Sequence, residues 1–186
     1  MCILFSKIYF IGFEKIPLLL HKVDMKVASV SGLKKELVQQ SKEDLVELLN
    51  AFIKYSKENK ELLNYLLFEA DFEENYIAKI KEEIGEEFDK IDSRSWKTMK
   101  KSIQRILRLL KKYIKYSKKA ETEIELLLFF CKRMNDLRIP LSRNPIILNI
   151  YKRQITAMNK ALLTLHEDLQ YDYREDIENA SAVIDF

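Results

Sequence analysis

Apolar residues recur along this chain at the three- and four-residue spacing of amphipathic α-helices. The clearest early example follows Ser41, where one helical face collects Leu45, Leu48, Leu49, Phe52 and Ile53. Ser41 itself suits the start of this helix, because its hydroxyl can accept a hydrogen bond from a free first-turn amide. The same spacing predicts further helices at 33–40, around 60–67, at 72–91, at 96–119, at 121–136 and from 145 to about 170.

Composition supports an all-α fold. Three Gly and three Pro in 186 residues are too few for a β-sandwich or barrel, which needs a turn about every 8–12 residues. The chain also lacks the Gly-rich loop of a dinucleotide site or a P-loop. Because the loops are short, we predict about six or seven helices packed as antiparallel hairpins. A helical bundle and a short stack of helical hairpins both satisfy this pattern.

The two ends of the chain are expected to lie outside an all-helical domain at 25–170. Residues 1–24 contain two apolar patches, which Glu14 and Lys15 separate, so no run reaches the ~20 residues of a membrane span. We interpret them as an N-terminal extension, with Met25 as the natural start; a helix or strand packed on the core is the alternative. Residues 171–186 carry five acids and one base, and are expected as an acidic tail that frays after about Asn179.

Two neighbouring helices carry opposite charge although the whole chain has a net charge of only +3. Residues 69–92 contain ten acids and three lysines, whereas residues 94–119 contain eleven bases and no acid. On the basic helix an apolar seam is formed by Trp96, Met99, Ile103, Ile106, Leu110 and Tyr113. A basic stripe lies opposite this seam and consists of Lys101, Arg105, Arg108, Lys112, Lys115 and Lys119.

The basic stripe has two interpretations. It could be a platform for an anionic partner such as nucleic acid, a membrane surface or an acidic protein. Alternatively, a hairpin turning at residues 92–93 would neutralise it internally. That hairpin would place Glu86 and Glu87 beside Lys97 and Lys100, Glu82 and Glu83 near Lys101, and Glu73 and Glu74 near Lys111 and Lys112. We favour internal neutralisation.

Catalytic and metal-binding motifs are not expected. His21 and His166 are far apart, and the chain has neither a His-Glu-x-x-His nor a Cys-x-x-Cys motif. Carboxylates at 82–87 could hold a divalent cation, although a solvated acidic face is the simpler interpretation. Cys131 lies in an apolar run and is interpreted as a core residue. Two distant cysteines give no disulfide framework, which favours a reducing, cytoplasmic compartment.

Several stretches carry a resemblance to a known family. They are Leu33-Lys-Lys-Glu-Leu37, Ser41-Lys-Glu-Asp-Leu45-Val-Glu-Leu48, Asn59-Lys-Glu61 leading to Tyr65-Leu66, the basic helix Ser95–Leu110 and the helix Leu126–Asn135. On these features, residues 33–170 resemble a family of uncharacterised all-helical bacterial proteins of unknown function. The resemblance implies an all-helical fold and agrees with a start at Met25. That family has no established activity, so the resemblance implies no site residue.

These observations predict a protein without cofactor, metal or catalytic activity. We expect a helical interaction module whose partner is another protein or a second copy of the chain. The alternative is a nucleic-acid or anionic-surface binder that uses the basic face of helix 95–119. A third and weaker hypothesis is an enzyme or metal site at 82–87. Salt-dependent retention on heparin would favour the second, and stabilisation by divalent cations the third.

Overall fold

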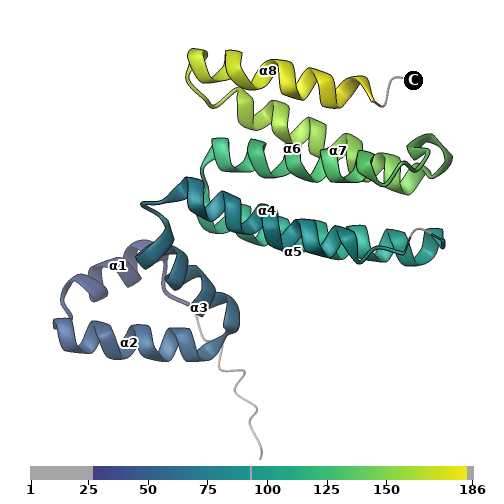
Figure 1. Ribbon diagram of the computed structural model, residues 1–186. Coiled ribbons are helices and arrows are strands. Elements are labelled where there is room, and N and C mark those ends of the chain that lie inside the picture. Colours follow the sequence, from purple (N-terminus) through teal and green to yellow (C-terminus); the bar gives the residue numbers. More distant parts are fainter. Residues whose placement is uncertain (1–26, 93, 184–186) are drawn as a thin grey trace, which may run out of the picture. The chain divides into compact units, whose positions relative to one another are not determined.

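The computed structural model describes residues 27–92 and 94–183, and within them the fold is all-α (Figure 1). The expected extension at 1–24 lies outside the described residues. The described part contains eight α-helices rather than six or seven. They are α1 (Val30–Val38), α2 (Lys42–Tyr55), α3 (Lys57–Asn64), α4 (Glu73–Asp89), α5 (Trp96–Ser117), α6 (Ala120–Asp136), α7 (Pro145–Leu162) and α8 (Glu167–Ala182).

The chain divides into two compact units, one ending at Val46 and the other beginning at Glu47. The described part of the first unit contains α1 and the start of α2. Both helices begin at a serine cap: the Ser29 hydroxyl accepts from the Gly32 amide at 3.1 Å, and the Ser41 hydroxyl accepts from the Asp44 amide at 3.1 Å. The cap predicted at Ser41 is therefore confirmed. Neither α1 nor α2 contains a buried residue.

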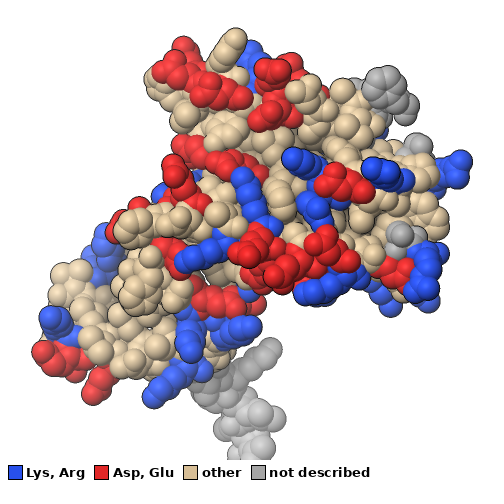
Figure 2. Space-filling model, viewed as in Figure 1, with Lys and Arg blue, Asp and Glu red and all other residues tan. Residues whose placement is uncertain are grey.

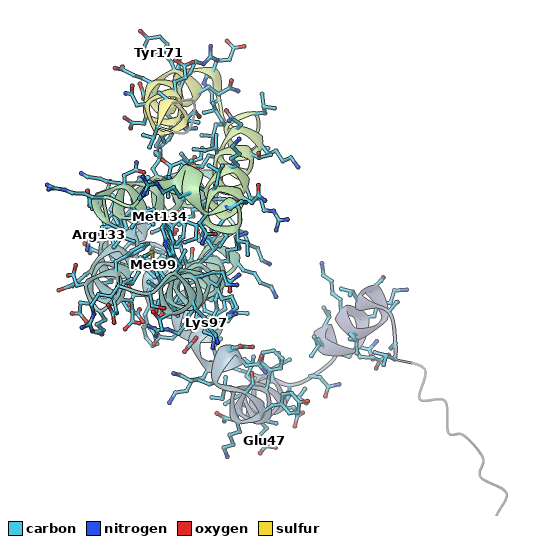
Figure 3. All side chains as sticks on the ribbon, turned by 90° about the vertical axis from the view of Figure 1, so that its right-hand side faces the viewer. Glu47, Lys97, Met99, Arg133, Met134 and Tyr171 are labelled. Carbon is cyan, nitrogen blue, oxygen red and sulfur yellow. The ribbon has the colours of Figure 1, made fainter. Side chains whose placement is uncertain are left out.

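Helices α4 to α8 of the second unit form a bundle. The hairpin of α4 and α5 packs against α6, α6 packs against α7, and α8 covers both α6 and α7. Apolar seams supply the core: Ile103 and Leu110, predicted for the seam of the basic helix α5, are fully buried, as is Ile84 on α4. Phe88 and Phe130 meet edge to face at 5.4 Å between ring centroids. Figure 3 shows Met99 and Met134 in this interior. Trp96, predicted for the seam, is 40% exposed.

A π-helical turn, η1 (Tyr65–Glu69), joins α3 to the hairpin. Its defining bond runs from the Ala70 amide to the Tyr65 carbonyl at 2.9 Å. The wider turn puts Tyr65 inside the protein, where it is 3% exposed, and leaves Leu66, Leu67 and Phe68 more than half exposed. Such turns are rare and occur often at functional sites.

The C-terminal part of the chain differs from the expectation. The helix predicted from 145 to about 170 ends at Leu162, and residues 167–182 form a separate helix, α8, instead of a frayed tail. Ile177 explains the difference, because it is buried at 2% exposure among the core residues. His166 lies at the start of α8 rather than at the end of a helix, and Glu167 and Asp168 occupy the first turn, where acids complement the helix dipole.

Candidate functional site

The predicted basic stripe is neutralised on one side only. Arg105 pairs with Glu87 of α4 at 2.5 Å, and Lys119 pairs with Glu73 of α4 at 2.9 Å. Lys112 pairs with Glu61 of α3 at 2.6 Å. Neutralisation within the hairpin is thus correct for Arg105 and Lys119, whereas Lys112 is neutralised by an acid outside the hairpin. We call these three residues the paired flank of α5.

The paired residues are not the ones that the hairpin register suggested. Lys97, Lys101 and Lys111 were expected beside acids of α4, but they form no ion pair with any described residue. The physical reason is that helical side chains lean toward the N-terminus of their own helix. In an antiparallel hairpin this lean displaces the charged ends in opposite directions, so each acid meets a residue up to about two turns further along the chain than the hairpin register suggested. Glu87 therefore meets Arg105 instead of Lys97 or Lys100.

Glu73 is the centre of the polar contacts on this flank. Its carboxylate accepts hydrogen bonds from Tyr65 at 2.8 Å, Ser117 at 2.5 Å and Thr122 at 2.6 Å, besides the ion pair with Lys119. Burial alone would raise the pKa of Glu73, but these four donors together hold it below its usual range. The carboxylate thus ties η1, α5 and α6 to the start of α4.

Glu61 and Glu87 are held in the same way. Burial would raise the pKa of Glu61, yet the hydrogen bonds from Lys112 and Tyr116 lower it below the usual value. A hydrogen bond from Lys90, together with that of Arg105, lowers the pKa of Glu87 against the effect of its partial burial. All three carboxylates are therefore ionised and engaged at neutral pH.

A cavity of about 430 Å³ opens beside this flank, between α3, η1, α4 and α5. Its aromatic wall is a cluster of tyrosines in edge-to-face or tilted contact, with Tyr65 and Tyr76 at 4.6 Å and Tyr113 and Tyr116 at 6.3 Å between ring centroids. Its charged residues balance, being Lys57, Lys60 and Lys79 against Glu61, Glu69 and Glu83. Sequence reasoning missed this cavity, because the tyrosines come from three different elements.

Three tyrosines of this cavity, Tyr76, Tyr113 and Tyr116, are neutral and hydrogen-bonded. Burial raises the pKa of Tyr76, Tyr113 and Tyr116, so their phenols stay neutral. The hydroxyls are already used: Tyr113 donates to Glu83 at 2.7 Å and Tyr76 to the Tyr113 carbonyl at 3.1 Å. The residues that line the cavity include no Ser, Cys or His.

The other side of α5 is open. Five exposed cations lie along it opposite the buried seam, and a sixth, Lys118, follows at its C-cap; none forms an ion pair with any residue that the structure describes. We call this set the outer face of α5, and it consists of Lys97, Lys101, Arg108, Lys111, Lys115 and Lys118. The predicted stripe is therefore divided: Lys101, Arg108 and Lys115 belong to the outer face, and Arg105, Lys112 and Lys119 to the paired flank.

Two of the four glutamates proposed for a metal site, Glu83 and Glu87, have other partners. Glu83 accepts a hydrogen bond from Tyr113, and Glu87 pairs with Lys90 and Arg105. Within residues 27–92 and 94–183, no group of three or more His, Cys, Asp or Glu side chains is arranged to hold a metal ion. Cys131 is a buried free thiol, as the interpretation of a core residue requires, and burial raises its pKa to about 12. The thiol is therefore neutral and not poised as a nucleophile.

Comparison with protein-family models, with curated proteins and with solved structures finds no match to this chain. The resemblance to uncharacterised all-helical bacterial proteins therefore stays a prediction. Among the described helices, none combines the length and the apolar character that crossing a bilayer requires.

Proposed function

We propose that this protein is a non-catalytic helical interaction module that binds an acidic surface of a protein partner through the outer face of α5. The observation that carries the proposal is the row of six exposed cations without an acidic partner in the described part of the chain. A row of like charges costs about 0.2–0.5 kcal/mol for each neighbouring pair. An acidic partner would remove this repulsion. The positive field of the face would also steer such a partner toward it.

The composition of the outer face favours a protein over a nucleic acid. Five of its six cations are lysines, which act as point charges, and Arg108 alone could contact a phosphate with two parallel hydrogen bonds. No aromatic side chain interrupts the row, so bases would find no stacking platform. The free Cys131 thiol agrees with a reducing, cytoplasmic compartment, which we include in the proposal.

Charge-neutral variants of the outer face test this function. The probe is fluorescently labelled poly-glutamate, a mimic of an acidic protein surface, and anisotropy measures its affinity. The test variant replaces Lys101, Arg108 and Lys115 with Gln. The matched control replaces the exposed α7 residues Lys152, Arg153 and Lys160 with Gln, which removes the same two lysines and one arginine elsewhere.

We expect the test variant to bind poly-glutamate at least about tenfold more weakly, a change of about 1.4 kcal/mol, and the control to bind as the wild type does. Equal affinity of both variants would contradict the proposal. Duplex DNA and vesicles containing anionic lipid are measured in parallel. If either binds more tightly than poly-glutamate and loses affinity in the test variant, the partner is nucleic acid or a membrane surface. For DNA, the logarithm of affinity would also fall with that of salt by about 0.9 per phosphate contacted.

A further inference from the structure

A second unpartnered face lies on α8. This helix contains six acids and one base, and its outer side carries the exposed residues Asp168, Asp172, Glu175 and Glu178. Tyr171 projects from the same side and is 81% exposed. None of these acids forms an ion pair with a lysine or arginine among the described residues. Figure 2 shows acidic side chains gathered along α8, at the top of the view.

The two unpartnered faces point away from each other. The hairpin of α4 and α5 lies at one end of the bundle and α8 at the other, and Figure 3 places Lys97 and Tyr171 at these opposite ends. The acidic face of one molecule therefore cannot neutralise the basic face of that same molecule. It can do so for a neighbouring molecule, because both faces are presented on the outside of the bundle.

The dimensions of the two helices agree with such a contact. At 1.5 Å per residue, the 16 residues of α8 span about 24 Å and the 22 residues of α5 about 33 Å. Because α8 is the shorter helix, its whole acidic face can lie along the outer face of α5. An exposed aromatic ring among the acids would meet lysine and arginine side chains, which favour contact with an aromatic face.

We propose that the outer face of α5 binds the acidic face of α8 of a second copy of this chain. This inference rests on the proposed function, since it names the acidic partner. The contact is heterologous, with different patches on the two molecules, so it leaves one acidic and one basic face free at the ends of every dimer. Unless the rotation between neighbours closes a ring, further copies add head to tail. One helix per side gives an interface below about 1,200 Å², which is the size of transient, salt-sensitive contacts.

Charge reversal on the full chain tests this assembly by sedimentation at about 50 mM and about 500 mM salt. One variant carries Asp172→Lys and Glu175→Lys, and a second carries Lys101→Glu and Arg108→Glu. A third variant combines all four changes. The control is Lys152→Glu with Arg153→Glu on α7, and circular dichroism verifies that each variant is folded.

We expect the wild type to associate at low salt and to dissociate at high salt. Each two-site reversal should weaken self-association at least about tenfold, because it puts like charges opposite one another at the changed positions. It also cancels the net charge of the acidic face, or two thirds of that of the outer face. Mixing the two reversal variants should restore association, because the unchanged acidic face of one variant meets the unchanged outer face of the other. The four-site variant should recover part of it on its own, because opposite charges again meet at the changed positions. The α7 control should behave as the wild type does.

Two results would overturn this inference: a wild type that stays monomeric at low salt, or reversals that change nothing. Restoration in the mixture is the decisive measurement, since misfolded variants would not restore association. The poly-glutamate experiment separates this inference from the proposed function. A monomeric chain that still binds poly-glutamate through α5 would exclude a second copy as the partner and leave the interaction module intact. If the α5 test variant and the α7 control bound poly-glutamate equally well, both the proposed function and this inference would be excluded.

Discussion

Helices α2 and α5 follow the same three- and four-residue apolar spacing, yet their apolar side chains lie in different surroundings. On α5, Ile103 and Leu110 are fully buried against neighbouring helices. On α2, Leu49 and Phe52 are 46% and 51% exposed, and the helix contains no buried residue. The spacing therefore determines which residues share a face. Whether that face is buried depends on a partner helix that the spacing does not specify.

The charged residues of the two helices also differ in how many partners they have. The paired flank of α5 binds acids from α3 and α4, and Glu73 connects it to α6. The charged residues of α2, such as Glu47, form no ion pair with other described residues. An isolated helix of 14 residues is marginal in water. Because no residue of α2 is buried, this helix depends on interactions between residues close in sequence. Helix α5 is stabilised by packing and by long-range ion pairs.

Matched leucine substitutions give the largest expected difference between the two helices. Leu110→Ala on α5 leaves a cavity in the core and should lower the free energy of unfolding by about 3–4 kcal/mol. Leu49→Ala on α2 should lower it by less than about 1 kcal/mol, since about half of that side chain is already in water. Urea unfolding followed by the fluorescence of Trp96, the sole tryptophan, measures both. Equal losses would mean that the apolar face of α2 is buried in solution.

Two glutamates make the corresponding polar comparison. Glu73→Ala removes the acceptor of three hydroxyls and one ammonium, and should cost about 2–3 kcal/mol because the buried hydroxyls of Tyr65 and Thr122 lose a charged partner. Glu47→Ala, on the exposed face of α2, should change the free energy of unfolding by less than about 0.5 kcal/mol. The same urea experiment checks both values. A cost below about 1 kcal/mol for Glu73→Ala would show that water replaces the carboxylate without loss.

The charge of Glu73 can be separated from its shape by Glu73→Gln and by pH. The folded protein holds the pKa of Glu73 below its ordinary value of 4.5. The stability contributed by the ionised form is therefore complete above that value and is lost as pH falls through the lower, folded-state pKa. We expect a wild type more stable than the variant by about 1–2 kcal/mol at neutral pH. The difference should shrink as the pH falls below about 4.5. A difference independent of pH would exclude the carboxylate charge as its cause.

The sequence was sufficient for the all-α fold and for the core seams of α4 and α5, because each seam depends on periodicity within one segment. Periodicity did not reveal α8, where a single buried isoleucine, Ile177, is surrounded by acids that suggested a tail. It also could not divide the basic stripe into Arg105, Lys112 and Lys119 on one side and Lys101, Arg108 and Lys115 on the other. That division depends on the lean of side chains across a hairpin and on Glu61, an acid from a different helix.

The tyrosine-lined cavity is a clearer case of a feature that periodicity within one segment cannot predict. Tyr65, Tyr76, Tyr113 and Tyr116 come from η1, α4 and α5, and the cavity exists because a π-helical turn directs Tyr65 inward. No local motif predicts such a turn, since its residues have the composition of an ordinary helix. A feature assembled from several elements, as this cavity is, thus required the three-dimensional arrangement.

The smallest expected effect concerns the helix starts. The Ser41 hydroxyl accepts from the Asp44 amide and donates to the Asp44 carboxylate at 2.7 Å, whereas Ser95 begins α5 without a side-chain hydrogen bond to its first turn. Ser41→Ala should cost about 1 kcal/mol and raise the hydrogen-exchange rates of the first-turn amides of α2 about fivefold. Ser95→Ala should leave the corresponding amides of α5 unchanged, because Met99 and its neighbours in the core hold that helix in place. Equal effects at both caps would contradict the distinction between a helix held by its own terminus and a helix held by its packing.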